Sequence, residues 1–163
     1  MLSLNRRFFC LSATALASGC GFEPVYGPTG SAQGLRGSVL VDAPIDKNSF
    51  DLTKHLEDRL GRATDPRFGL SYLIETSIDP LGITPNQETT RYNVLGEVAF
   101  ALRDLNTQNV LTEGVAKNFT SFGATSNPVS TRTASEAAFE RLMIVLGDDI
   151  TEHLILNSGS FLP

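Results

Sequence analysis

The feature of this 163-residue sequence that most constrains its fold is an alternation of side chains between residues 89 and 104. Five apolar residues of this segment take even positions, and four charged or amide residues take odd positions. The even set is Tyr92, Val94, Val98, Phe100 and Leu102, and the odd set is Arg91, Asn93, Glu97 and Arg103. Successive side chains of a strand point to opposite faces of a sheet, so this parity predicts an antiparallel strand with one buried and one solvated face.

Three further segments have the pattern of strands, namely 37–42, 68–78 and 110–122. In the second of these, Leu73 and Thr76 interrupt an alternation that is otherwise regular. Its apolar side is Phe68, Leu70, Tyr72, Ile74 and Ile78, and its polar side is Ser71, Glu75 and Ser77. Prolines, glycines and asparagines predict a turn over 79–86, and a hairpin turn is expected at 106–109.

Two segments predict helices. The first begins at a cap provided by Asn48 or Ser49 and runs to about Arg62, with leucines recurring every fourth residue on one face. The second follows a polar loop over 123–132, where Thr133 and Glu136 have the spacing of a capping box. Its apolar stripe, ended by residues 157–159, is Phe139, Leu142, Met143, Leu146, Ile150 and Leu154.

The order of these elements predicts an α+β fold. Strand, helix, three strands and helix (β-α-β-β-β-α) pack most economically as two helices on one face of a mostly antiparallel four-stranded sheet. The expected domain organisation is residues 1–19 as a signal peptide, 20–36 as a lipidated flexible tether, 37–158 as a single domain and 159–163 as a C-terminal tail. Glycine, proline and serine dominate residues 21–34, which favours a tether there.

The first twenty residues have the order of an export signal. Arg6 and Arg7 form a basic start, an apolar stretch follows over 8–18, and small residues lead directly into Cys20. This ending resembles a bacterial lipobox, although the leucine is Leu16 rather than the residue at position 17. An ordinary signal peptide with an incidental cysteine is the alternative. The paired arginines also resemble a twin-arginine signal, so the export route stays open.

In lipobox chemistry the chain is cleaved before the cysteine. Cys20 then becomes an N-palmitoyl, S-diacylglycerol cysteine, and its acyl chains anchor the protein to a membrane. Loss of residues 1–19 removes Arg6, Arg7 and Cys10 and changes the formal charge from −5 to −7. No free thiol would then remain for a disulfide or a nucleophile.

The composition argues against several classes of function. A formal charge of −5 is unlike that of nucleic-acid-binding proteins, which carry basic stripes. Two cysteines and two histidines are too few for a zinc site, so neither a metal nor a cofactor is expected. His55 and His153 lack an acid or nucleophile at a catalytic spacing. The acidic pairs Asp148-Asp149 and Glu57-Asp58 are interpreted as solvated surface, because adjacent helical residues point about 100° apart. We therefore expect no enzymatic activity.

The residues around the lipobox resemble the start of a known family. Residues 20–27 read Cys-Gly-Phe-Glu-Pro-Val-Tyr-Gly, and this run is similar to the beginning of the lipopolysaccharide-assembly lipoprotein family LptE in its alphaproteobacterial form. Two later stretches add to the resemblance, namely 90–94, which opens the central strand, and the closing helix over 134–156. The element order predicted above agrees with the sheet and two helices of that family.

The resemblance implies a non-enzymatic role at the outer membrane. A member of this family would plug and help assemble the LptD-type β-barrel and bind lipopolysaccharide on its way to the cell surface. Its domain would face the periplasm and the barrel lumen, held by the lipid on Cys20. Arg91 and Arg103 are candidate contacts for lipid A phosphates, with simple solvation or contact with a barrel acid as the alternative. The alternative function is an envelope lipoprotein that scaffolds another complex or captures a ligand without a lipopolysaccharide role, and an enzyme is the third possibility.

Overall fold

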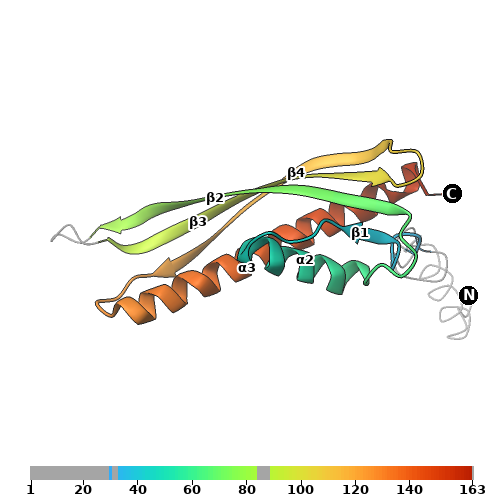
Figure 1. Cartoon of the computed structure of the whole chain (residues 1–163). Coiled ribbons are helices and arrows are strands. Elements are labelled where there is room, and N and C mark those ends of the chain that lie inside the picture. Colours follow the sequence, from blue (N-terminus) through green and yellow to red (C-terminus); the bar gives the residue numbers. More distant parts are fainter. Residues whose placement is uncertain (1–29, 31–32, 84–88, 163) are drawn as a thin grey trace, which may run out of the picture.

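The computed structural model describes residue 30, residues 33–83 and residues 89–162. The four strands form one sheet in the order β1-β2-β3-β4, in which β1 is parallel to β2 and the other pairs are antiparallel. Both long helices lie on the same face of this sheet (Figure 1), which confirms the predicted α+β fold. The elements are β1 (Val39–Val41), α2 (Lys47–Leu60), β2 (Phe68–Ile83), β3 (Thr89–Asp104), β4 (Val110–Gly123), α3 (Pro128–Asn157) and the short helix η1 (Ser158–Ser160).

The alternation in β3 has the predicted effect. Val94, Val98 and Leu102 are fully buried and Phe100 is nearly so, while Arg91 and Arg103 are exposed. The register carries the same parity into both neighbouring strands, because Val98 lies between Ile74 of β2 and Ala116 of β4. The even positions of three strands therefore form one apolar floor, which the helices cover.

The predicted stripe of α3 covers this floor. Leu142, Met143, Leu146, Ile150 and Leu154 are fully buried, and Phe139 packs against them from the edge. Two glycines bring the layers close together. A Cβ on Gly96 of β3 would lie 2.9 Å from side-chain atoms of Leu142 and Leu146, and a Cβ on Gly147 would lie 2.8 Å from the ring of His55 on α2. Small residues at these two points thus set the distances of α3 from the sheet and from α2.

The start of α2 differs from the prediction. Neither Asn48 nor Ser49 is the cap, because Asp46 holds that position and its carboxylate accepts a hydrogen bond from the backbone N–H of Ser49 at 2.8 Å. The Ser49 hydroxyl in turn accepts from the backbone N–H of Asp46, which completes a capping box. The Asp46 carboxylate accepts hydrogen bonds from the Ser49 backbone N–H and from the Ser49 hydroxyl, and these two bonds lower its pKa from the ordinary value of 3.8 because they stabilise the ionised form.

The start of α3 also differs from the prediction. The helix begins at Pro128, five residues before Thr133, so the predicted capping box at Thr133 and Glu136 is wrong. The side chain of Asn127 is the cap, since its oxygen accepts hydrogen bonds from the backbone N–H groups of Val129 and Ser130. Proline suits the first helical position because its missing N–H would have no partner there. Thr133 lies inside the helix and donates its hydroxyl to the Val129 carbonyl.

Strand β2 continues through the turn predicted over 79–86, as far as Ile83. Opposite it, β3 supplies a partner for each residue up to Pro80, and the register then shifts around Gly82. Proline is tolerated here because the described strands pair with this part of β2 on its β3 side alone, so no ladder hydrogen bond on the other side is lost. The turn predicted at 106–109 is present, and Asp104 accepts hydrogen bonds there from the N–H groups of Asn106 and Thr107.

Packed structure extends beyond the predicted limits of 37 and 158. Leu35, assigned above to the tether, is buried in the core. At the other terminus, the ring of Phe161 meets that of Phe68 edge-on at 6.0 Å, and Leu162 packs against the core close to Gly34. Apolar side chains at both termini thus close the same end of the sheet, opposite the β2–β3 hairpin (Figure 1).

Candidate functional site

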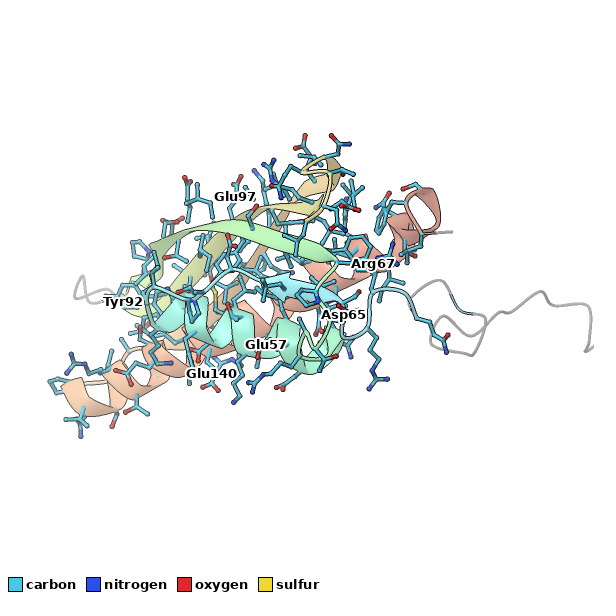
Figure 2. The ribbon with its side chains drawn as sticks, turned by 45° about the vertical axis from the view of Figure 1, so that its right-hand side comes forward. Glu57, Asp65, Arg67, Tyr92, Glu97 and Glu140 are labelled. Atoms are coloured by element: carbon cyan, nitrogen blue, oxygen red, sulfur yellow. The ribbon has the colours of Figure 1, made fainter. Side chains whose placement is uncertain are left out.

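The described elements leave uncovered the face of the sheet that is turned away from both helices (Figure 1). Figure 2 shows Glu97 on this side, whereas Glu57 and Glu140 lie on the outer sides of the helices. We call this surface the helix-free face. It is formed by the odd-numbered residues Leu73, Glu75 and Ser77 of β2, Leu95, Glu97 and Ala99 of β3, and Val115, Lys117 and Phe119 of β4.

Apolar side chains are unusually prominent on this face. Leu73 is 63% exposed, Val115 is 52% exposed and Phe119 is 62% exposed. The register places Leu73 and Val115 on either side of Ala99 in one row, and Leu95 next to Phe119 in a second row. Exposed apolar groups that cluster across neighbouring strands typically mark a surface that another molecule covers.

A charged row separates the two apolar rows. Glu75 lies opposite Glu97, which lies opposite Lys117, and the Lys117 ammonium is 2.8 Å from the Glu97 carboxylate. Directly opposed like charges destabilise a sheet, so Lys117 offsets the repulsion between the two glutamates. A hollow of about 440 Å³ opens along this row and is also lined by Leu95 and Phe119. The helix-free face thus combines apolar contact area with a fixed pattern of charge, which suits binding to a protein surface.

The structure places the two candidate phosphate contacts far apart. Arg91 and Arg103 are both exposed on odd positions of β3, near its opposite ends. Twelve residues of extended strand span about 40 Å. The two arginines therefore belong to separate surfaces and cannot both contact the same phosphate group.

Both histidines and the pair Asp148-Asp149 tie α3 to a neighbouring element, either α2 or β4. His55 Nε2 is 3.0 Å from Asp148 Oδ1, and the Arg59 guanidinium shares that carboxylate at 3.2 Å, so α2 and α3 are tied together. His153 Nε2 lies 3.1 Å from the Thr112 hydroxyl of β4. Asp149 points elsewhere and accepts a hydrogen bond from Asn118 at 3.2 Å.

Asp148 and Asp149 therefore do not converge on one point, as their adjacent helical positions predicted. Among the described residues, no three of the histidine, cysteine, aspartate or glutamate side chains are grouped so that they could hold a metal ion. Also within the described ranges, no helix is long and apolar enough to cross a membrane. The signal peptide, Cys20 and the motif over 20–27 lie outside the described residues.

Sequence reasoning missed the apolar content of the helix-free face. Leu73 interrupts the alternation predicted for 68–78, and the pattern of 110–122 does not distinguish Val115 or Phe119. The signal was present in the sequence, because all three residues hold odd positions in strands whose even positions already supply the core. Apolar residues on both sides of a strand indicate that both faces of the sheet are buried when the protein performs its function.

Comparisons with known proteins bear on the fold. A scan against protein-family models found no match, and a search of curated proteins found none either. Among solved structures, a protein of Caulobacter crescentus CB15 provisionally named a lipoprotein has a TM-score of 0.67 and 16% identity, covering 82% of this chain and 98% of that one.

Two further solved structures share the arrangement. Rare lipoprotein B from Shewanella oneidensis has a TM-score of 0.53 and 13% identity, covering 76% of this chain and 92% of its own. A minor lipoprotein from Acinetobacter baumannii has a TM-score of 0.53 and 17% identity, covering 74% and 90%. At these identities the likeness establishes a shared fold, and all three of these bacterial proteins are described as lipoproteins.

Proposed function

We propose that this chain is an outer-membrane lipoprotein that plugs and helps assemble an LptD-type β-barrel and binds lipopolysaccharide during its transport. The observation that carries the proposal is the fold shared with the Caulobacter lipoprotein over 98% of that protein, in a chain that begins with a lipobox-like sequence. The choice of barrel and ligand rests on the resemblance of residues 20–27 to the LptE family. The protein acts by binding and turns over no substrate.

The lipid anchor is the first part of this proposal. Cys20 carries the acyl chains, and three such chains hold a protein on a membrane essentially permanently, at about 0.8 kcal/mol per buried CH₂. Mass spectrometry of the membrane fraction is then expected to find a chain that starts at Cys20 with added acyl mass. Recovery of an unmodified Cys20, or of cleavage elsewhere, contradicts the anchor.

The shape and surface of the domain support a place inside a barrel. Helix α3 has 30 residues and is about 45 Å long, and the helix-free face extends along strands of comparable length. Wide barrels have polar interiors. The charged row of Glu75, Glu97 and Lys117 suits such a wall, and the exposed side chains of Leu73 and Phe119 provide apolar contact area beside that row. In this arrangement the helix-free face lies against the barrel wall.

Co-purification tests this arrangement. The full chain carries an affinity tag and is purified from gently solubilised membranes, and the LptD-type barrel is measured in the eluate. Phe119→Ser, on the helix-free face, is expected to reduce the recovered barrel. The matched control is Phe50→Ser on the outer side of α2, because Phe50 is 56% exposed and Phe119 is 62% exposed.

The outcomes of this experiment distinguish the barrel role from the alternative role as a scaffold for another envelope complex. Recovery of the barrel with the wild type and the Phe50 variant, and its loss with the Phe119 variant, supports the proposal. Equal recovery with both variants contradicts the assignment of the face. Absence of the barrel from the wild-type eluate contradicts the barrel role and leaves an envelope lipoprotein that scaffolds another complex.

A further inference from the structure

A second hollow lies on the helix-covered side of the sheet, where the first turns of α3 leave the strands. It is a shallow hollow, largely open to solvent, with a volume of about 440 Å³. Each long strand contributes one wall residue, namely Ile78 of β2, Tyr92 of β3 and Phe122 of β4, and the remaining walls come from the loop and helix over 124–135. We call this hollow the tip pocket. It lies at the hairpin end of the molecule, where Figure 2 shows Tyr92.

The pocket exists because α3 touches the sheet along only part of its length. Ala134 packs against the core while still half-buried. The first fully buried residue of α3 is Ala138, whose carbonyl accepts a hydrogen bond from the Thr120 hydroxyl at 2.9 Å. Before that point, no residue of α3 is buried. A sheet twists whereas a helix runs straight, so the two separate toward the hairpin end. The opening is therefore a consequence of the architecture and not of one side-chain conformation.

The floor of the tip pocket is apolar. The rings of Tyr92 and Phe122 are stacked, with centroids 5.2 Å apart and planes inclined by 15°. Ile78 beside them is 46% exposed. These three side chains share the parity of the core residues, but they differ in burial: Phe122 is buried, Tyr92 is half-buried and Ile78 is exposed. They continue the core floor into the tip pocket, where Ile78 and Tyr92 leave apolar surface open to solvent.

The rim is polar and carries a cation. Thr131 and Ser135 bring hydroxyl groups from α3, and the Thr131 hydroxyl is already engaged with the backbone of Thr125. Arg132 lies at the mouth with its side chain 83% exposed. Its Nε is 3.7 Å from Glu136, a distance beyond a hydrogen bond, so the guanidinium keeps its donors available for another anion.

The geometry points to the tip pocket as a binding site for one hydrocarbon chain of an anionic amphiphile. The chain lies over Ile78 and the stacked rings, and its acidic head group meets Arg132 at the mouth. A volume of about 440 Å³ falls in the range of about 300–1,000 Å³ that small-molecule sites occupy. An apolar floor with one convergent cation matches the two parts of such a molecule, whereas an apolar peptide segment would leave Arg132 without a partner.

This inference deepens the proposed function, and rests on it only for the source of the chain. If the protein binds lipopolysaccharide, an acyl chain of that lipid is the natural occupant. A phospholipid chain would fill the same space with the same head-group chemistry. The experiment below distinguishes these sources, and it also separates the failure of the pocket from the failure of the barrel role.

The test is photo-crosslinking of the full chain in cells. A diazirine-bearing amino acid replaces Ser135 in the pocket or, as the control, Thr133, which is exposed on the same helix outside the pocket. The two positions point about 200° apart around the helix axis. Cells are fed an alkyne-tagged fatty acid, irradiated, and the purified chain is assayed for tagged lipid. Mass spectrometry of the adduct then identifies the lipid.

We expect several-fold more lipid at position 135 than at position 133, with a phosphate-bearing or carboxylate-bearing lipid in the adduct. Arg132→Gln is expected to reduce the label at position 135 several-fold, whereas Arg141→Gln, an exposed arginine farther along α3, leaves it unchanged. Equal label at positions 133 and 135 overturns the inference, because it indicates adsorption to the surface. An adduct with a protein, or with the chain's own anchor at Cys20, overturns it too.

The amount of barrel measured in the same eluates distinguishes the lipid site in the tip pocket from the barrel role. Barrel recovery without label at position 135 contradicts the tip pocket alone. Label at position 135 without barrel contradicts the barrel role alone and leaves the pocket as a lipid site.

Discussion

Phe100 and Arg103 lie three positions apart on β3 and face opposite sides of the sheet. Phe100 is buried and meets the ring of His153 edge-on at 5.1 Å, whereas Arg103 is exposed. Phe100→Ala is expected to lower the free energy of unfolding by about 3–5 kcal/mol, because it leaves a cavity in the core. Arg103→Ala is expected to lower it by less than about 0.5 kcal/mol. Urea denaturation measures both values, and equal losses would contradict the register.

Asp46 gives a second residue-scale prediction, which depends on pH. Its capping hydrogen bonds hold the pKa of its carboxyl below 3.8 in the folded chain, so folding favours the ionised form. The resulting stabilisation is complete above the unfolded pKa and is lost as the pH falls through the folded pKa. Asp46→Ala is expected to cost about 1 kcal/mol at pH 7, and the difference from wild type shrinks in acid.

Unfolding free energies between pH 7 and pH 2 test this expectation. Asp46→Asn is the control, because the amide oxygen still accepts the hydrogen bond of the Ser49 N–H but does not titrate. A gap between wild type and Asp46→Ala that widens in acid would contradict the role of the ionised cap.

The two separated arginines make a further prediction at this scale. If Arg91 or Arg103 contacts a lipid A phosphate, Arg91→Glu or Arg103→Glu weakens lipopolysaccharide binding more at low salt than at high salt. Screening shrinks an exposed ionic interaction, so the effect is largest when salt is lowest. Because the two residues lie about 40 Å apart on one strand, their effects are expected to add. Binding measured across salt concentrations for both single variants and the double variant tests this, and a salt-independent loss would contradict phosphate contact.

At the scale of elements, Gly96 controls how closely α3 approaches the sheet. A Cβ at this position would lie 2.9 Å from Leu142 and Leu146, so Gly96→Val is expected to cost about 1–3 kcal/mol through overpacking. Ala99→Val is the matched control, because Ala99 is exposed on the helix-free face of the same strand. Thermal unfolding of both variants is the measurement. A stable Gly96→Val variant would mean that the helix can move away from the sheet without penalty.

The elements also show which parts of the fold the sequence could predict. The parity of β3 and the apolar stripe of α3 were predicted correctly, because each repeats over many residues and has one low-energy way to be buried. The helix starts were predicted wrongly, because a single side chain decides them. Asp46 and Asn127 accept the first backbone N–H groups, and several nearby polar residues could have done the same. The extension of β2 past Pro80 depends on pairing with β3, which no local pattern contains.

The candidate site was predictable in part. The solvated side of β3 was expected from the charged residues at its odd positions, and Glu97 does lie there. The apolar rows required the register of three strands, since Leu73, Ala99 and Val115 become neighbours only when the strands align. The tip pocket depends on the divergence of α3 from a twisted sheet, which is a property of the assembled layers and of no single segment.

At the scale of the whole molecule, we propose different roles for the two ends of the domain. Leu35, Phe161 and Leu162 close the end where the described chain enters the fold, so the proposed anchor at Cys20 connects there. The hairpin, Arg91 and the tip pocket lie at the far end of a helix about 45 Å long. In this proposal the elongated domain is held to the membrane at one end by the anchor at Cys20. It binds the barrel through the helix-free face and a lipid chain through the tip pocket at its other end.

Depletion of this protein in cells tests that account most directly, with the amount of correctly assembled LptD-type barrel as the measurement. The account predicts that depletion leaves the barrel misassembled and lipopolysaccharide missing from the cell surface, and that resupply of the full chain restores both. A resupplied chain with Phe119→Ser is expected to restore less assembled barrel than one with Phe50→Ser. Normal barrel assembly and normal surface lipopolysaccharide in depleted cells would contradict the account.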